Sequence, residues 1–386
     1  MTTTFQHQSR SLAQSLAIQS QIHLPGTVGR ILSQIREIEQ VAPIFAQAGL
    51  VKSVDRPNPL NLRAAGIATE SATQKTLGGY LYVSAASRLD LEVTNNAVST
   101  TSQDSACELD DINFEDQSKR LQLIGIRQAY EMADAALKSG VPYNLLMLDC
   151  PLTLERSMVP EKSESNRKYK QTYERTVEVI SDFWRTHRDK VLPWNRKGVA
   201  VVGLTSKRYG AIVQIAQQDL RTPEGRNQIL STERIDEGAL AFLDVSLGSV
   251  MGIGERRFVY GLLGSYTRTA AFRMNVRTPQ MEPRDVIDLG VTGFHFRAAQ
   301  NTGIRLMQLI GAAPDWTAKL LDQVCGQVMG LTIVGGQDAM PLPIQLAARE
   351  HKGLKNFLEY YSRSVVEGLK QREVEEIWLS GLEEEI

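Results

Sequence analysis

Apolar positions along the first 93 residues are spaced first as in helices and then as in strands. Residues 10–50 predict two helices broken at Pro25-Gly26. The second helix has one apolar stripe, since its apolar side chains recur every three or four positions: Val28, Ile31, Leu32, Ile35, Ile38 and Val41. Residues 51–63 contain PNPLN and predict a linker. Residues 62–71 and 78–93 then predict two strands, with a turn at Gly78-Gly79.

The segment 94–116 changes in character, because it is polar, acidic and poor in large apolar side chains. Its carboxylates have neither the glycine at the turn nor the closing glutamate of a calcium loop. We therefore expect an exposed surface loop here.

The rest of the chain predicts helices and strands in alternation. In chain order we expect a helix over 119–140 that ends at Gly140, a buried strand in 141–152, a charged helical region over 155–197 with a long amphipathic helix at 169–191, a strand at 198–207, helices and loops over 207–255, strands at 258–276 and 291–299, and a last helix over 343–384. Strands interleaved with helices predict an α/β fold, with a mixed sheet covered by helices on both faces.

Composition narrows the class of protein. Apolar residues make up 42% and charged residues 23%, which is typical of a globular chain, and the formal net charge of −1 excludes a polybasic nucleic-acid binder. DNA stays possible as a substrate, because 43 Lys and Arg can line one groove. The three cysteines form no CxxC pair, and no apolar run reaches the roughly 18 residues of a membrane span. We expect a soluble cytoplasmic protein without a membrane segment.

Asp149 is the first candidate for chemistry. It follows the apolar run 145–148, and ligands of open α/β sheets bind outside the carboxyl ends of strands. The alternative is that Asp149 only caps a turn. Glu131 lies 18 positions earlier on the preceding helix, which should pack antiparallel to the strand and bring the two carboxylates to one metal ion. The alternative for Glu131 is a solvated helix carboxylate.

Several segments together resemble the NurA nuclease family. Residues 127–156 resemble the family's central motif, a helical Glu before a strand that ends in Asp-Gly-Pro-Leu. Further segments match in the same order: 64–71 and 78–87 at the first catalytic strand, 199–208 at a strand that ends in lysine, 258–276 and 294–299 at late strands, and 340–354 at a proline-leucine segment before a histidine.

The resemblance implies an RNase H-like core, a homodimer, docking onto the hexameric HerA ATPase, and degradation of DNA ends with manganese or magnesium. Asp149 and Glu131 would be metal ligands, and His351 would orient the attacked phosphate or water. Lys207, with Arg208 beside it, would hold a phosphate. The implied organisation is a helical extension over 1–55, a nuclease core over 56–355 and a C-terminal helix over 356–386.

Departures from the family pattern leave an alternative open. The first motif lacks Asp-Gly-Ser, so either Thr69 or Glu70 takes the place of its aspartate; we favour Glu70 as the third metal ligand. A shift of one residue along a strand changes the face, so the two choices are not equivalent. Met340 stands where a tyrosine is usual, and Cys150 where a glycine is common. A catalytically decayed dimer that serves the ATPase as an adaptor is therefore the second hypothesis.

The requirements of phosphodiester hydrolysis support the nuclease hypothesis independently of the family resemblance. Phosphodiester hydrolysis needs a hydroxide at neutral pH and positive charge on the phosphate oxygens, and cations held by carboxylates supply both. Oxygen ligands suit Mg²⁺ or Mn²⁺. The segment GIGERR lacks the Lys-Ser/Thr of a phosphate-binding loop, so a partner would have to supply any ATPase activity. His295, between Phe294 and Phe296, is interpreted as structural or groove-lining.

Overall fold

The structure is a computed structural model. It describes residues 11–76, 79–113, 117–154, 156–160, 167–205, 222–223, 233, 248, 252–274, 289–312, 315–336 and 340–372.

Within these residues, ten strands form one mixed sheet in the order β1-β7-β9-β10-β6-β5-β2-β3-β4, with β8 beside β9. β2 is parallel to β5 and β5 to β6, and the other pairs are antiparallel. The order β4-β3-β2-β5-β6 is the arrangement expected of an RNase H-like core. The strands are β1 Val51–Ser53, β2 Leu62–Thr76, β3 Gly79–Thr94, β4 Ala97–Asn113, β5 Leu145–Leu148, β6 Ala200–Thr205, β7 Thr267–Thr269, β8 Phe272–Arg273, β9 Val291–Arg297 and β10 Arg305–Ile310.

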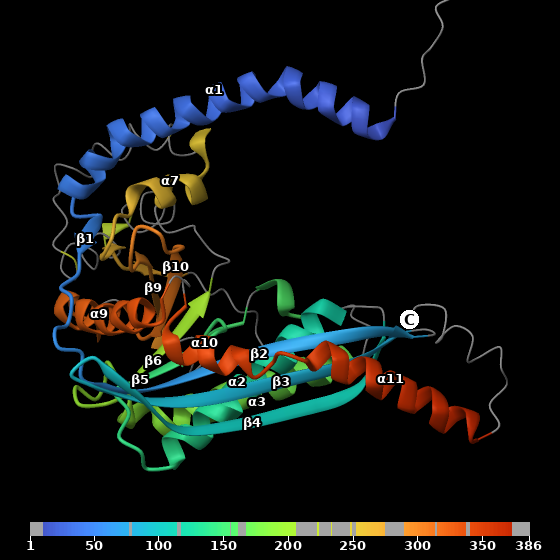
Figure 1. The fold of residues 1–386 in the computed structure, drawn as a ribbon. Helices are drawn as coiled ribbons and strands as arrows, with labels where there is room; N and C mark the ends of the chain where they lie inside the picture. Colours follow the sequence, from blue (N-terminus) through green and yellow to red (C-terminus); the bar gives the residue numbers. More distant parts are fainter. Residues whose placement is uncertain are drawn as a thin grey trace, which may run out of the picture.

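Helices cover both faces of this sheet, as predicted (Figure 1). On one face, Ile67 and Leu148 share a core with Tyr130 and Tyr173 of two helices, α2 and α3. The opposite face packs against α9 and α10. The helices are α2 Gln117–Lys138, α3 Arg167–His187, α7 Glu255–Leu262, α9 Ala318–Val334, α10 Leu342–Arg349 and α11 Leu354–Lys370, with short 3-10 turns at Arg156–Met158 and Arg188–Lys190.

The N-terminal region corrects one prediction. Residues 10–50 form one helix, α1 Leu12–Gln47, which continues through Pro25 and Pro43. A proline removes one backbone donor and bends the helix, but the turns on either side keep their hydrogen bonds and water can reach the carbonyl that is left over. Figure 1 accordingly shows a long, curved helix that projects from the body. The helical extension over 1–55 also ends in β1, which pairs with β7.

The segment 94–116 was wrongly predicted as a loop. Most of it is β4, which pairs with β3 from Thr94↔Ala97 to Gly79↔Asn113. Asn95 and Asn96 both have positive φ angles, 52° and 66°, and make the two-residue turn that joins twisted antiparallel strands. Within the described residues β4 is an edge strand, and most of its polar side chains are exposed to solvent. A strand with little apolar content cannot be told from a loop by periodicity.

Later segments differ in three places. The predicted strand at 258–276 begins as helix α7, and only the short β7 and β8 follow. The predicted helix over 343–384 is two helices, because Gly353 with φ 109° ends the turn between α10 and α11. β10 was not predicted at all. Residues 373–386 and most of 207–255 lie outside the described part of the chain.

Among the helices that the structure describes, none has the combination of length and apolar sequence that a membrane crossing requires.

Candidate active site

Asp149 and Glu70 come from neighbouring parallel strands. Ile67 of β2 lies opposite Leu148 of β5, and the backbone N–H of Asp149 donates to the carbonyl of Ile67 at 2.9 Å, so the pairing extends one residue beyond β5. Met147 and Ala68 pack into the core on the α9/α10 face. Because side chains alternate along a strand, Asp149 and Glu70 emerge on this same face. The two carboxylates therefore lie diagonally across adjacent strands.

Both residues line one cleft of about 490 Å³. The cleft lies at the carboxyl ends of β5 and β6, beside the first three turns of α2, and β2 continues past it as a wall. Its lining residues are Thr69, Glu70, Ser71, Thr73, Gln117, Ser118, Leu121, Gln122, Gly125, Ile126, Asp149, Cys150, Pro151, Met158, Leu204, Thr205 and Arg305. Asp149 is exposed to solvent within it.

The faces of β2 distinguish the two candidates of the first motif. Thr69 faces α2, where a Cβ built on Gly125 would lie 3.3 Å from its Oγ1. Glu70 faces the opposite side, and its Oε2 lies 3.9 Å from Nδ1 of His351. Glu70, the favoured candidate, is thus the one that emerges on the same face as Asp149.

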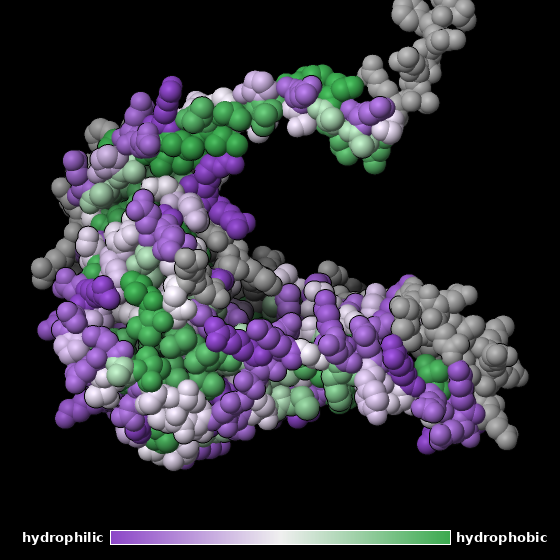
Figure 2. Space-filling model, viewed as in Figure 1, coloured by the Kyte–Doolittle hydropathy of each residue, from purple (hydrophilic) through white to green (hydrophobic). Residues whose placement is uncertain are grey.

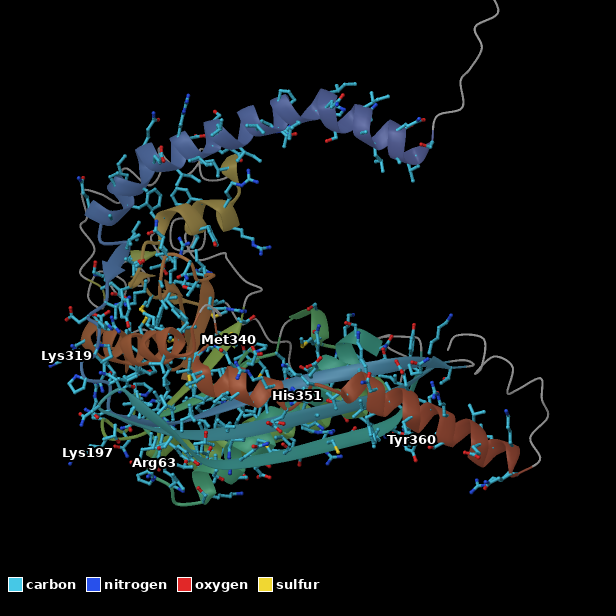
Figure 3. All side chains as sticks on the ribbon, in the orientation of Figure 1. Arg63, Lys197, Lys319, Met340, His351 and Tyr360 are labelled. Carbon is cyan, nitrogen blue, oxygen red and sulfur yellow. The ribbon has the colours of Figure 1, made fainter. Side chains whose placement is uncertain are left out.

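His351 lies in the turn between α10 and α11 (Figure 3), where it is close to Glu70 of β2 and Ser87 of β3. Its side chain is buried, and Nε2 forms a hydrogen bond of 3.1 Å with Oγ of Ser87 on β3. Burial lowers the pKa of His351, an effect that the negative charges of Glu70 and Glu350 oppose only in part. The imidazole is therefore neutral at neutral pH.

Gly66 determines how closely α10 approaches the sheet. A Cβ at Gly66 would lie 2.5 Å from the backbone nitrogen of Ile344. Only glycine leaves room for the α10 backbone here. This close contact seats the helix that leads into His351.

The structure does not bring Glu131 to the cleft. Its carboxylate is exposed and lies 3.6 Å from Nε of Arg127, which also pairs with Glu108 of β4. The part of α2 that lines the cleft ends at Ile126. Glu131 is five residues further, which is about 7.5 Å along the helix axis and on another side of the helix. Among the described residues, no three His, Cys, Asp or Glu side chains group as metal ligands would.

Other predicted residues have varied positions. Lys207 and Arg208 lie outside the described residues. His295 is buried and stacks on Phe272, on the face opposite Phe294 and Phe296, as the structural interpretation expects. Cys150 is buried, and burial together with the charge of Asp149 raises the pKa of its thiol.

Sequence reasoning missed two parts of the cleft wall. The first turns of α2 contribute Gln117, Ser118 and Gln122, and β10 contributes Arg305. The antiparallel packing predicted for the helix at 119–140 was the signal that could have pointed to its N-terminal end, but the prediction used it only for Glu131. Arg305 gave no such signal, because β10 itself was not predicted.

Comparison with known proteins identifies the fold. No protein-family model matches the sequence, and no curated protein does. The solved structure of the NurA nuclease from Sulfolobus solfataricus is similar, with 12% identity over 91% of this chain and 98% of that one and a TM-score of 0.53. A second NurA structure has 12% identity, covers 90% and 97%, and has a TM-score of 0.44. A NurA structure bound to dAMP and manganese has 14% identity, covers 88% and 94%, and has a TM-score of 0.39. The chain thus has the NurA fold, as the resemblance of its segments implied.

Proposed function

We propose that this chain is a subunit of a metal-dependent DNA nuclease that hydrolyses phosphodiester bonds. The observation that carries the proposal is the pair of carboxylates, Glu70 and Asp149, which emerge on one face of adjacent strands and line one cleft. The NurA fold supports the proposal, and the resemblance of the chain's segments to the family implies metal ligands at these two positions.

The lining of the cleft fits a hard divalent cation. Glu70 and Asp149 offer carboxylate oxygens, and Mg²⁺ or Mn²⁺ commonly takes one or two carboxylates and completes its shell with water and phosphate oxygens. When bound, such an ion makes hydroxide available at neutral pH and neutralises the phosphate. The neutral His351 acts as a positioning residue, because its buried ring lies beside the Glu70 carboxylate and limits where that carboxylate can move.

We further propose that the subunit works as a homodimer with a HerA-like hexameric ATPase in DNA end processing or defence. The sequence has no phosphate-binding loop of its own, so ATP-driven movement of DNA would come from a partner. The exposed apolar side chains of α1 suit a contact with a second copy of the chain.

One observation favours the alternative, a catalytically decayed adaptor. The described residues of α2 that line the cleft are amides, a hydroxyl and apolar groups, with no third carboxylate among them. Met340, in the place of the family tyrosine, is buried against the α9/α10 core. An adaptor would keep the fold and the dimer but not the cutting.

DNA degradation by the purified chain separates the two functions. Linear duplex and single-stranded DNA are incubated with Mn²⁺ or Mg²⁺, with and without a HerA-like ATPase. We expect the wild type to cut, and Asp149→Asn to be slower by on the order of 10²- to 10³-fold, as for other losses of electrostatic stabilisation. Asp189→Asn is the matched control, because Asp189 is exposed in the 3-10 turn before β6, at the other end of that strand. A wild type that is inert with every metal and with the ATPase present would establish the adaptor instead.

A further inference from the structure

The cleft also contains a cation that neither the motifs nor the resemblance identified. Arg305 is the first residue of β10 and lies in the cleft wall. β10 is antiparallel to β6, with Leu306 opposite Thr205. Met307 packs on the α9/α10 face, so Arg305, two residues away on the same strand, also emerges on that face. This is the face on which Asp149 and Glu70 emerge.

The strand order places Asp149 between the other two charged groups. Along β2-β5-β6-β10, Glu70 belongs to the strand on one side of β5, and Arg305 to the second strand on its other side. At a strand spacing of about 4.8 Å, β10 lies about 10 Å from β5. An extended arginine side chain can cross part of that distance and leave room for a phosphate group beside the carboxylates.

The guanidinium of Arg305 has no partner within the described part of the chain. No hydrogen bond or ion pair of its side chain is found there, although the residue is half-buried. Other half-buried or buried arginines are paired: Arg63 with Glu92, Arg127 with Glu108 and Arg268 with Glu233. Arg305 is also the only Lys or Arg among the described residues of the cleft. A planar guanidinium with free donors is suited to bind two oxygens of one phosphate.

We propose that Arg305 binds non-bridging oxygens of the DNA phosphate that is to be cut. This inference rests on the proposed nuclease function and deepens it. Two carboxylates are enough for one cation, whereas the hydrolysis of a phosphodiester in a two-cation site draws on two. The guanidinium supplies positive charge on the side of the phosphate away from Glu70, where a second cation would otherwise be needed.

The test measures DNA binding as well as cutting. Binding of a labelled single-stranded oligonucleotide is measured in Ca²⁺ at several salt concentrations, and kcat/KM for its hydrolysis is measured in Mn²⁺. We expect Arg305→Gln to reduce the slope of log Kd against log salt by about 0.7, the value for one lost phosphate contact on a single strand. We expect its kcat/KM to fall by on the order of 10²-fold. Arg305→Lys keeps the charge, so its salt slope should match the wild type while its kcat/KM falls less.

The control is Arg196→Gln, which removes the same charge from an exposed position just before β6, at the end of the strand away from the cleft. It should leave both measurements unchanged. Thermal unfolding measures whether each variant is folded. If Arg305→Gln does not fold, the kcat/KM of Arg305→Lys decides the outcome.

Unchanged salt slope and unchanged kcat/KM in the Arg305 variants of a wild type that cuts DNA would overturn the role of Arg305 and leave the nuclease function intact. If the wild type binds DNA without cutting it, the phosphate contact of Arg305 is judged from the salt slope alone: an unchanged slope in Arg305→Gln overturns it. A wild type that neither binds nor cuts DNA overturns both proposals.

Discussion

The side chains of Glu70 and Asp149 reach one cleft because each lies an even number of positions from a core residue of its own strand. Ala68 and Met147 fix which face is buried against α9 and α10, and two residues further along each strand a carboxylate emerges on that face. Past the carboxyl end of β5 the side chain of Asp149 is exposed to solvent, and more than half of the Glu70 side chain is exposed as well. The chemistry of the site thus depends on strand register.

His351 should make the stability of the protein depend on pH. Burial lowers its pKa, so below the ordinary value of about 6.5 the unfolded chain takes up a proton that the folded chain resists. The contribution of the neutral His351 ring to the free energy of unfolding is therefore fully present above pH 6.5. It is lost as the pH falls from 6.5 towards the lowered pKa of the folded state. His351→Gln removes this dependence, and the amide can still bond to Ser87.

The measurement is the free energy of unfolding in urea at pH 7.5, 6.5 and 5.5. We expect the advantage of the wild type over His351→Gln to be largest at pH 7.5 and to narrow as the pH falls. Parallel pH profiles of the two proteins would contradict the burial of His351.

Single residues differ in how far the sequence predicts them. Asp149 could be placed because the apolar run before it ends abruptly, whereas Glu70 was preferred to Thr69 from the resemblance to the first motif of the NurA family. Glu131 could not, since its position depends on how the helix is rotated and on the length of the connection, and neither is encoded in the spacing alone. Its partner Arg127 pairs with Glu108 on β4, a strand that the sequence did not reveal.

At the scale of elements, α1 is the feature that a monomer explains least well. Only its C-terminal part packs on the body, where Phe45 contacts Phe258 of α7 at 4.9 Å between ring centroids. The apolar stripe continues beyond that contact, and Figure 2 shows it on the projecting helix. Its exposed apolar residues are Leu12, Leu16, Ile18, Ile22, Leu24, Val28, Ile31, Leu32 and Ile35. Between α1 and α7 lies an apolar groove of about 930 Å³.

Charges placed on this stripe should separate the proposed dimer. Burial of a large apolar side chain contributes about 1.5–3 kcal/mol, so Leu24→Glu with Val28→Glu should weaken dimerisation at least about 10²-fold. Sedimentation velocity should then give two chains for the wild type and one chain of 42.9 kDa for the double variant. Ser33→Glu, an exposed polar position on α1, is the control and should remain dimeric. A monomeric wild type would contradict the proposal.

Elements with a long, regular apolar pattern were predictable, whereas the polar strand β4 and the short strand β10 were not. α2, α3, β5 and β6 each bury a recognisable pattern, and all four were found close to their predicted ranges. β4 is a polar strand at the edge of the described sheet, and β10 is short and follows a loop. α1 was predicted as two helices because a proline inside a helix is usually a boundary.

At the scale of the whole molecule, one sheet joins the five strands of an RNase H-like core to further strands at one edge. The core strands end with β6, and β10, β9, β7 and β1 continue the sheet from that edge. The sequence order of these strands gives no hint of the pairing of β10 with β6, because antiparallel contacts between distant segments depend on the complete fold. Arg305 joins the wall of the cleft at this junction. The strands beyond β6 therefore contribute to the site as well as to the shape in Figure 1.

Binding of Mn²⁺ to the purified protein, followed by electron paramagnetic resonance, tests the central claim most directly. If Glu70 and Asp149 hold the ion, Glu70→Gln and Asp149→Asn should each weaken binding by at least about 10-fold, since even changes outside the ligand shell have effects of this size. Glu131→Gln should bind Mn²⁺ as the wild type does, because Glu131 lies outside the cleft. Wild-type affinity in Asp149→Asn, or lost binding in Glu131→Gln, would contradict the account.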